Sequence, residues 1–228
     1  MKLLNVLKIN NLGTTKHCHK LIINGLITIN NKVIYNNVEV SNNDRIMYQN
    51  KLLENNYKYI MINKPKGYIC SNSDKNNKCL DSLIDDKGLS YVGRLDKDTT
   101  GLVLMTNDNY LRNHLLLPNF HKDKKYLFNC LKPLSNQDIK TISEGIVLNN
   151  GYKCLEANIE LHSPSSGVIT IYEGKYHQIK RMFQAINNKI TSLHRLSISS
   201  LKLSDLKEGN YRHLTTKEIE DLYKKISR

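Results

Sequence analysis

The chain has 228 residues, enough for one large domain or for a small module beside a medium-sized one, which excludes a bare peptide or tail. Its 34 Lys and Arg outnumber its 21 Asp and Glu, but 39% of the residues are apolar, which excludes a disordered polycation and predicts a folded basic protein. No apolar run approaches the roughly 18 residues of a membrane helix and no signal peptide is visible, so we expect a cytoplasmic protein.

The first fifty or so residues are predicted to fold as a unit of their own. Apolar residues at positions 3, 4 and 7 predict a short helix, and Thr14 or Thr15 can cap a second helix that runs to Gly25. Short antiparallel strands are expected over 26–29, 33–34, 38–40 and 44–48.

The polar stretch 49–56 is the expected linker between domains at residues 1–54 and 57–228. In the second domain, strands are predicted over 59–62, 102–105, 126–131, 157–161 and 168–172, and helices over 135–144, over 177–186 and from 215 onward. Many strands that do not alternate regularly with helices favour an α+β fold with a mixed, largely antiparallel sheet over a doubly wound one.

A polar loop over 93–101 runs directly into the apolar strand predicted at 102–105. A loop anchored by a buried strand holds a reactive side chain rigidly while leaving it reachable. Asp96 lies in this loop between Arg94 and Lys97, whose charges favour an ionised carboxylate that can act as a nucleophile or a base. The spacing alone favours the alternative, a structural loop whose aspartates cap backbone amides.

The helix predicted at 177–186 has two distinct faces. Its apolar stripe consists of Ile179, Met182, Phe183 and Ile186. Its polar face consists of His177, Lys180, Arg181 and Gln184. Such a face can contact phosphates or pair with a catalytic carboxylate, although a merely solvated face explains it equally well.

Two further features are weaker. Lys64 lies in a rigid basic turn that suits backbone phosphates but is ordinary as a connection. Tyr126 opens a strand amid lysines, where it can stack on a nucleobase, although packing is the commoner role of a tyrosine. The sequence has no zinc-hydrolase, nucleotide-hydrolase or serine-hydrolase motif, and its five scattered cysteines form no Cys-x-x-Cys pair, so we expect no metal site.

Taken together, these motifs resemble those of the RsuA-type pseudouridine synthases, which act on ribosomal RNA. The resemblance rests on stretches 63–67, 93–108, 125–126, 173–182, 193–195 and 209–215, in this order. The first region is similar, more loosely, to the small RNA-binding domain named after the fourth small-subunit ribosomal protein. There, Thr15, Lys16 and His17 stand where that domain usually has Ser-Arg-Arg. The resemblance therefore implies a small helix-rich RNA-binding domain followed by the pseudouridine synthase fold.

The resemblance also implies roles for individual residues. Asp96 would be the essential aspartate, Tyr126 the active-site tyrosine and Lys180 the partner of the aspartate. The residues expected to bind RNA are Lys16, His17, Lys20, Lys64, Arg94, His177, Arg181 and Arg195. The implied reaction, isomerisation of uridine to pseudouridine, requires no cofactor.

The leading hypothesis is a 16S rRNA pseudouridine synthase that works as a monomer on RNA within a small-subunit assembly intermediate, with no membrane partner. An enzyme of the same family that modifies 23S rRNA is the closest alternative, and a non-catalytic RNA-binding or ribosome-assembly protein is the second. Residues 1–56 contain 7 basic and 3 acidic residues and the remainder 27 and 18, so both regions are basic, as suits an RNA that crosses both.

Overall fold

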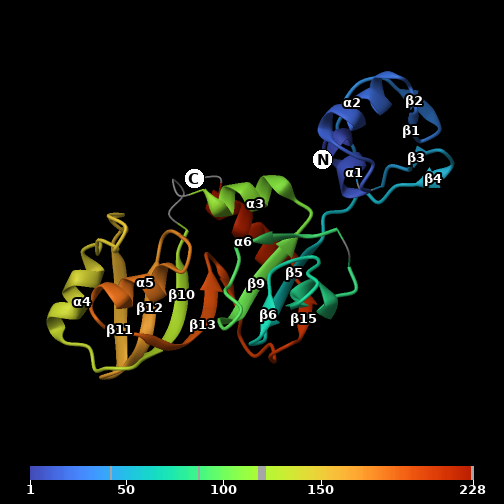
Figure 1. Ribbon diagram of the computed structural model, residues 1–228. Helices are drawn as coiled ribbons and strands as arrows, with labels where there is room; N and C mark the ends of the chain where they lie inside the picture. Colours follow the sequence, from blue (N-terminus) through green and yellow to red (C-terminus); the bar gives the residue numbers. More distant parts are fainter. Residues whose placement is uncertain (42, 87, 118–121, 227–228) are drawn as a thin grey trace. The chain divides into compact units, whose positions relative to one another are not determined.

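The computed structural model describes residues 1–41, 43–86, 88–117 and 122–226. The chain divides into two compact units, Met1–Lys58 and Tyr59–Arg228 (Figure 1). The division lies a few residues beyond the boundary that we placed between 54 and 57. Nowhere in the described ranges is a helix long and apolar enough to span a membrane.

The first unit combines two helices with a small antiparallel sheet. The helices are α1 (Leu3–Ile9) and α2 (Thr15–Ile23), and the strands are β1 (Ile27–Ile29), β2 (Lys32–Ile34), β3 (Ile46–Tyr48) and β4 (Lys51–Leu52), in the order β2-β1-β3-β4. Thr14 caps α2 by accepting a hydrogen bond from the backbone N–H of His17. The apolar faces of both helices meet β1 and β3 in one buried core, which includes Leu7, Ile22 and Ile27.

The strand predicted at 38–40 is not formed. Its backbone instead pairs with the start of the chain, where Leu3 donates its N–H to the carbonyl of Val38 and Val40 donates to the carbonyl of Met1. These hydrogen bonds satisfy the backbone without a separate strand.

The stretch 49–56 is not a free linker, contrary to our prediction. Gln49 and Asn50 adopt left-handed conformations, with φ of 48° and 61°, and turn the chain from β3 into β4. Leu53 is then buried in the core of the first unit. The polar composition of this stretch reflects a hairpin turn.

The second unit is built on a nine-stranded sheet. Its main path runs β11-β12-β10-β13-β9-β5-β15, with β14 beside β13 and β8 beside β9. The strands are β5 (Tyr59–Lys64), β8 (Ser90–Val92), β9 (Thr100–Thr106), β10 (Lys124–Cys130), β11 (Ala157–Ser163), β12 (Ser166–Ile171), β13 (Ile190–Ile198), β14 (Leu201–Lys202) and β15 (Tyr211–His213). Within the described residues, β9 and β13 are the one parallel pair of this sheet. A separate pair, β6 (Tyr68–Ile69) and β7 (Lys78–Cys79), precedes a short 3₁₀ helix, η1 (Leu80–Leu83).

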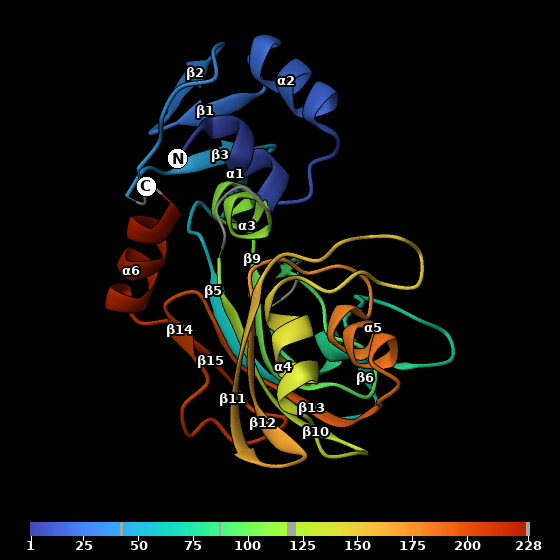
Figure 2. The ribbon, with the colours of Figure 1, turned by 90° about the vertical axis from the view of Figure 1, so that its left-hand side faces the viewer.

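Two helices cover one face of the sheet at its β11-β12-β10 end: α4 (Asn136–Ser143) and α5 (Gln178–Ala185) (Figures 1 and 2). The apolar stripe predicted for the helix at 177–186 faces this core. Phe183 of α5 packs on Phe128 of β10 with 5.1 Å between ring centroids. This packing fixes α5 against the sheet and directs its polar face away from the core.

The other two helices, α3 (Asn109–Leu116) and α6 (Thr216–Ile226), contact each other near β5 and β9. The fully buried Asp108 caps α3 and accepts hydrogen bonds from the hydroxyls of Tyr59 and Tyr223, which join α3, β5 and α6. The α+β fold class predicted from the sequence is confirmed, but α3, β13 and the short elements β6, β7, η1, β8, β14 and β15 were not predicted.

Candidate active site

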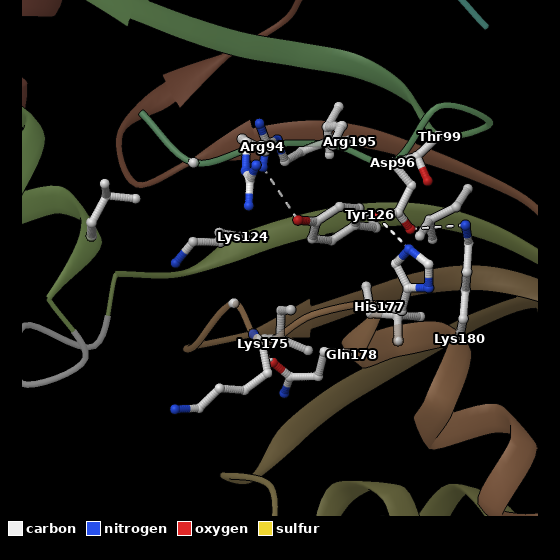
Figure 3. A pocket seen from close by; sticks show the side chains of 17 residues that line it. Arg94, Asp96, Thr99, Lys124, Tyr126, Lys175, His177, Gln178, Lys180 and Arg195 are labelled. Atoms are coloured by element: carbon white, nitrogen blue, oxygen red, sulfur yellow. Dashed lines mark hydrogen bonds and ion pairs between the residues drawn. The ribbon is translucent and has the colours of Figure 1, made fainter. Parts of the chain in front are cut away.

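A cavity of about 130 Å³ lies where five segments of the second unit converge (Figure 3). The segments are the loop between β8 and β9, the end of α3, strand β10, the stretch from the end of β12 into α5, and strand β13. Of the predicted site residues, Arg94, Asp96, Tyr126, His177, Lys180 and Arg195 all line this cavity. The fold thus brings together residues that are up to 101 positions apart in the sequence.

Asp96 is held by two side chains, His177 at the start of α5 and Lys180 in its first turn. The Lys180 Nζ atom lies 2.8 Å from Oδ2 of Asp96, and the His177 Nε2 atom lies 3.2 Å from Oδ1. Lys180 also contacts Asp98 at 2.6 Å. Because each carboxylate oxygen of Asp96 has a partner, both oxygens are fixed in direction while retaining lone pairs for a ligand.

The ion pairs shift the pKa values of Lys180 and Asp98. Burial lowers the pKa of Lys180, but its hydrogen bonds and charge interactions with Asp96 and Asp98 outweigh burial, and the net pKa lies above its ordinary value. Burial likewise raises the pKa of Asp98, but the hydrogen bond and charge of Lys180 bring the net pKa below its ordinary value. Lys180 is therefore a firm positive charge beside Asp96.

Lys64 anchors the loop that carries Asp96. This side chain is fully buried and donates hydrogen bonds to the backbone carbonyls of Thr99, at 2.7 Å, and of Lys97, at 3.3 Å. Burial lowers the pKa of Lys64. This placement does not fit the RNA contact that we predicted for Lys64, because the ammonium group is inaccessible. We assign Lys64 instead to positioning the loop.

The turn into α5 positions His177 through a buried carboxylate. Glu173 accepts hydrogen bonds from the Tyr152 hydroxyl at 2.5 Å and from Gln178 Nε2 at 2.8 Å, and Gln178 Oε1 accepts from the N–H of Lys175 at 2.9 Å. His177 adopts the left-handed conformation, with φ of 50° and ψ of 32°, which is unusual outside glycine. These hydrogen bonds stabilise a backbone conformation that directs the imidazole to Asp96.

Tyr126 and Arg195 form the inner wall of the cavity. Tyr126 is 7% exposed and Arg195 2% exposed, on the neighbouring strands β10 and β13. Arg195 donates from Nε to the carbonyl of Leu102 at 2.6 Å and from Nη1 to the Tyr126 hydroxyl at 3.4 Å. Its Nη2 atom is buried without a hydrogen-bond partner among the described residues. Because the guanidinium is buried, its contacts in this structure hold the Tyr126 hydroxyl and the backbone of β9, and the RNA contact of Arg195 stays a prediction.

Lys124 completes this end of the cavity, beside the hydroxyl of Tyr126 in Figure 3. Burial, reinforced by the charge of Arg195, lowers the pKa of Lys124 to about 8. Lys124 was not among the site residues predicted from the sequence. The alternation of a strand places Lys124 and Tyr126 on one face, so the spacing contained the signal.

The remaining predicted residues lie outside this group. Lys16, His17 and Lys20 are exposed on α2 of the first unit. Arg181 is on α5 and donates to the backbone carbonyl of Tyr176 at 3.5 Å, but it does not line the cavity. Asp98, Glu173 and Gln178 were also missed, because nothing in their spacing separates them from ordinary loop and helix residues.

The chain is similar to known proteins in both sequence and structure. The family described as RNA pseudouridylate synthase matches residues 58–185. The ribosomal small subunit pseudouridine synthase A of Vibrio vulnificus is 35% identical over 93% of this chain and 95% of its own length. The protein of the same name from Escherichia coli is 39% identical over 71% of this chain and 72% of its own. A crystal structure of a pseudouridylate synthase, 35% identical, superposes with a TM-score of 0.71 and covers 97% of this chain and 99% of that one.

Proposed function

The chain belongs to the RNA pseudouridylate synthase family, and from that premise we propose that it converts a specific uridine of 16S ribosomal RNA to pseudouridine. The names of the relatives from Vibrio vulnificus and Escherichia coli support the small-subunit RNA over the 23S RNA. The observation that carries the proposal is the Asp96 carboxylate, held by Lys180 and His177 at a cavity lined by Tyr126.

The reaction breaks the bond from the sugar to N1 of uracil and joins the same sugar carbon to C5, with no net oxidation. The uridine must first leave its stack, at a cost of a few kcal/mol, and enter an enclosed site. The Tyr126 ring offers a stacking surface there, and cationic side chains that line the cavity, Arg94 and Lys124, offer donors for oxygens of the nucleotide. The cavity thus supplies the two kinds of contact that hold a flipped base.

Asp96 is the group we assign to the chemistry. As in the family, it acts either by covalent attack on the sugar or base or by removing a sugar proton to give a glycal. Both routes require a carboxylate of fixed direction in a partly dry site, which the contacts with Lys180 and His177 supply.

A proton must leave C5 after the base has turned and the new bond has formed. The Tyr126 hydroxyl is our candidate for its acceptor, because it lies in the cavity and contacts the Arg195 guanidinium. We further propose that the protein acts in the cytoplasm as a monomer, on RNA within a small-subunit assembly intermediate.

The test is a map of pseudouridines in 16S and 23S rRNA, read as carbodiimide-dependent primer stops, from cells with and without the gene. We expect one 16S stop to disappear with the gene and to return with the wild-type gene on a plasmid. Loss of a 23S stop instead would select the large-subunit substrate. Unchanged maps of both RNAs would contradict catalysis on rRNA and leave a non-catalytic RNA-binding protein.

A further inference from the structure

Tyr176 presents an exposed aromatic ring at the rim of the active site. Its side chain is 75% exposed, the largest fraction among the large apolar side chains in the described part of the chain. One face of its ring stacks on the imidazole of His177, with centroids 3.8 Å apart and an interplanar angle of 17°. The high exposure therefore leaves the opposite ring face open to a ligand.

The Tyr176 ring lines a groove that continues from the cavity. This groove has a volume of about 960 Å³, against about 130 Å³ for the cavity, and shares Asp96 and His177 with it. A space of this size accommodates more of an RNA strand than the target nucleotide. Tyr176 thus lies where neighbouring nucleotides of the substrate would pass.

The charge of the groove suits a phosphodiester chain. Four cations, Arg94, Lys97, Arg112 and Lys175, line it together with a single carboxylate, that of Asp96, among its described lining residues. A positively charged groove with an aromatic surface is the usual arrangement for holding single-stranded nucleic acid.

We propose that Tyr176, backed by His177, is a stacking platform for an unpaired base next to the target uridine; the proposal rests on the function proposed above. When a uridine leaves a stack, its neighbour loses one stacking partner. An open aromatic face beside the cavity replaces that partner and offsets part of the cost of flipping.

The platform is held in place before RNA arrives. The Arg181 guanidinium donates to the backbone carbonyl of Tyr176, and the left-handed backbone of His177 is stabilised by the hydrogen bonds around Glu173. An aromatic ring that is already ordered loses little conformational entropy on binding. The contribution of Tyr176 should therefore appear in RNA binding.

The experiment is a double-mutant cycle between the protein and the RNA. The probe is a fragment of 16S rRNA that contains the target uridine, with or without an abasic nucleotide on its 5′ or its 3′ side, and the dissociation constant is measured by fluorescence anisotropy. We expect Tyr176→Leu in the full chain to weaken binding of the intact RNA on the order of tenfold. One abasic site should weaken wild-type binding by the same factor and leave Tyr176→Leu binding unchanged.

Two matched variants separate stacking from a general surface effect. Tyr176→Phe keeps the ring and should bind intact RNA as the wild type does. Tyr110→Leu removes another exposed ring, on α3, which lines neither the cavity nor the groove, and should also bind as the wild type does. In turnover assays, Tyr176→Leu should raise KM and leave kcat within about twofold of the wild type.

The outcomes distinguish the platform from the function on which it rests. In one outcome, wild-type protein forms pseudouridine in the intact fragment, but the losses of binding free energy from Tyr176→Leu and from each abasic site are additive. This outcome overturns the platform and leaves the proposed function standing. If wild-type protein forms no pseudouridine in any fragment of 16S or 23S rRNA, the proposed function is overturned and the platform with it.

Discussion

Lys180 connects the helix α5 to the loop that carries the reacting carboxylate. Its ammonium group contacts Asp96 at 2.8 Å and Asp98 at 2.6 Å, and its side chain is 22% exposed. In such a partly dry place, a fixed positive charge orients a carboxylate more strongly than it would in water. The direction of the Asp96 carboxylate therefore depends on Lys180 at one oxygen, as it does on His177 at the other.

We predict that Lys180→Met lowers kcat by about a hundredfold, the effect typical of losing one oriented electrostatic partner, and leaves RNA affinity within a few-fold of the wild type. Lys180→Arg, which retains the charge, should recover part of the rate. Single-turnover rates and dissociation constants measure the two effects separately. A Lys180→Met protein with a normal rate and weak RNA binding would show that Lys180 binds phosphate instead.

The lowered pKa of Lys124, a lysine of the cavity, predicts that the stability of the protein depends on pH. Its pKa is lowered to about 8 in the folded protein by burial and by Arg195, from an ordinary value of 10.5. Between these two values the unfolded chain binds more protons than the folded chain, so the free energy of unfolding should rise with pH across this window. Below pH 8 both states are protonated, and the burial cost is present in full.

The Lys124→Met variant should therefore lose this rise, while Lys125→Met, which removes an exposed lysine of the same strand, should keep it. Urea midpoints between pH 7 and pH 10.5 measure the difference. Parallel curves for the wild type and Lys124→Met would contradict the lowered pKa.

The site residues differ in how far the sequence alone defines them. The helical spacing of His177 and Lys180 predicts a shared face, and the structure places both on Asp96. Burial could not be predicted in the same way. The ammonium group of Lys64 donates to three backbone carbonyls. The sequence does not distinguish such a buried lysine at the end of a strand from a lysine that contacts RNA.

At the level of secondary structure, the parallel pairing of β9 and β13 positions the inner wall of the site. The pairing matches Gly101 with Arg195, the residue whose guanidinium contacts Tyr126. A Cβ atom on Gly101 would lie 2.4 Å from the carbonyl oxygen of Arg195, and the φ of Gly101 is 102°. Only glycine allows this close approach of the two strands.

We expect Gly101→Ala to destabilise the protein by at least about 2 kcal/mol, because it adds a clash with backbone to the cost of a positive φ. Gly209→Ala is the matched control: its φ is 83° and nothing lies within 4 Å of its Cβ position, so it should lose about 1 kcal/mol. Thermal or urea unfolding measures both. Equal losses in the two variants would contradict the close packing of β9 on β13.

The elements that the sequence predicted are those with a clear hydrophobic period, such as α5, or with an unbroken apolar run, such as β9. Strand β13 was missed because its apolar residues at 190, 193, 196 and 198 do not alternate: its pairing with β10 shifts register twice, and two of its buried positions are the polar residues Arg195 and Ser197. Helix α3 was missed although Asp108, which accepts hydrogen bonds from the backbone N–H groups of Tyr110 and Leu111, is an ordinary N-cap residue: the eight-residue helix buries only Leu111 and Leu115, too few apolar positions to show a helical period.

At the scale of the whole molecule, both units are basic, and the first presents lysines on an exposed helix face. Lys16 and Lys20 are one turn apart on α2, opposite the buried residues Leu21 and Ile22. If this face contacts RNA phosphates, each lysine contributes to the salt dependence of binding through the release of counterions.

We predict that the double variant Lys16→Gln/Lys20→Gln lowers the slope of log affinity against log salt by about 1 to 2 and leaves kcat at saturating RNA unchanged. The control is Lys32→Gln/Lys51→Gln, which removes two exposed lysines from strands β2 and β4 of the same unit and should leave the slope closer to that of the wild type. Dissociation constants across a salt series measure the slopes. Indistinguishable slopes for the two double variants would contradict an RNA face on α2.

The overall architecture was more predictable than its connections. Strands that outnumber helices without regular alternation predict an α+β fold, and the structure confirms it. The stretch 49–56 was misassigned as a linker because polar residues serve a hairpin turn and a linker equally well. The left-handed pair Gln49 and Asn50 is visible only in the folded backbone.

The central claim, that Asp96 performs the isomerisation of a uridine in 16S rRNA, has one direct test. A 16S rRNA transcript is incubated with purified wild-type protein or with Asp96→Asn, at concentrations that bind the RNA equally, and pseudouridine is then measured by mass spectrometry of the digested RNA. We predict one pseudouridine per transcript with the wild type and none above background with Asp96→Asn. Formation of pseudouridine by Asp96→Asn at a rate near that of the wild type would contradict the claim.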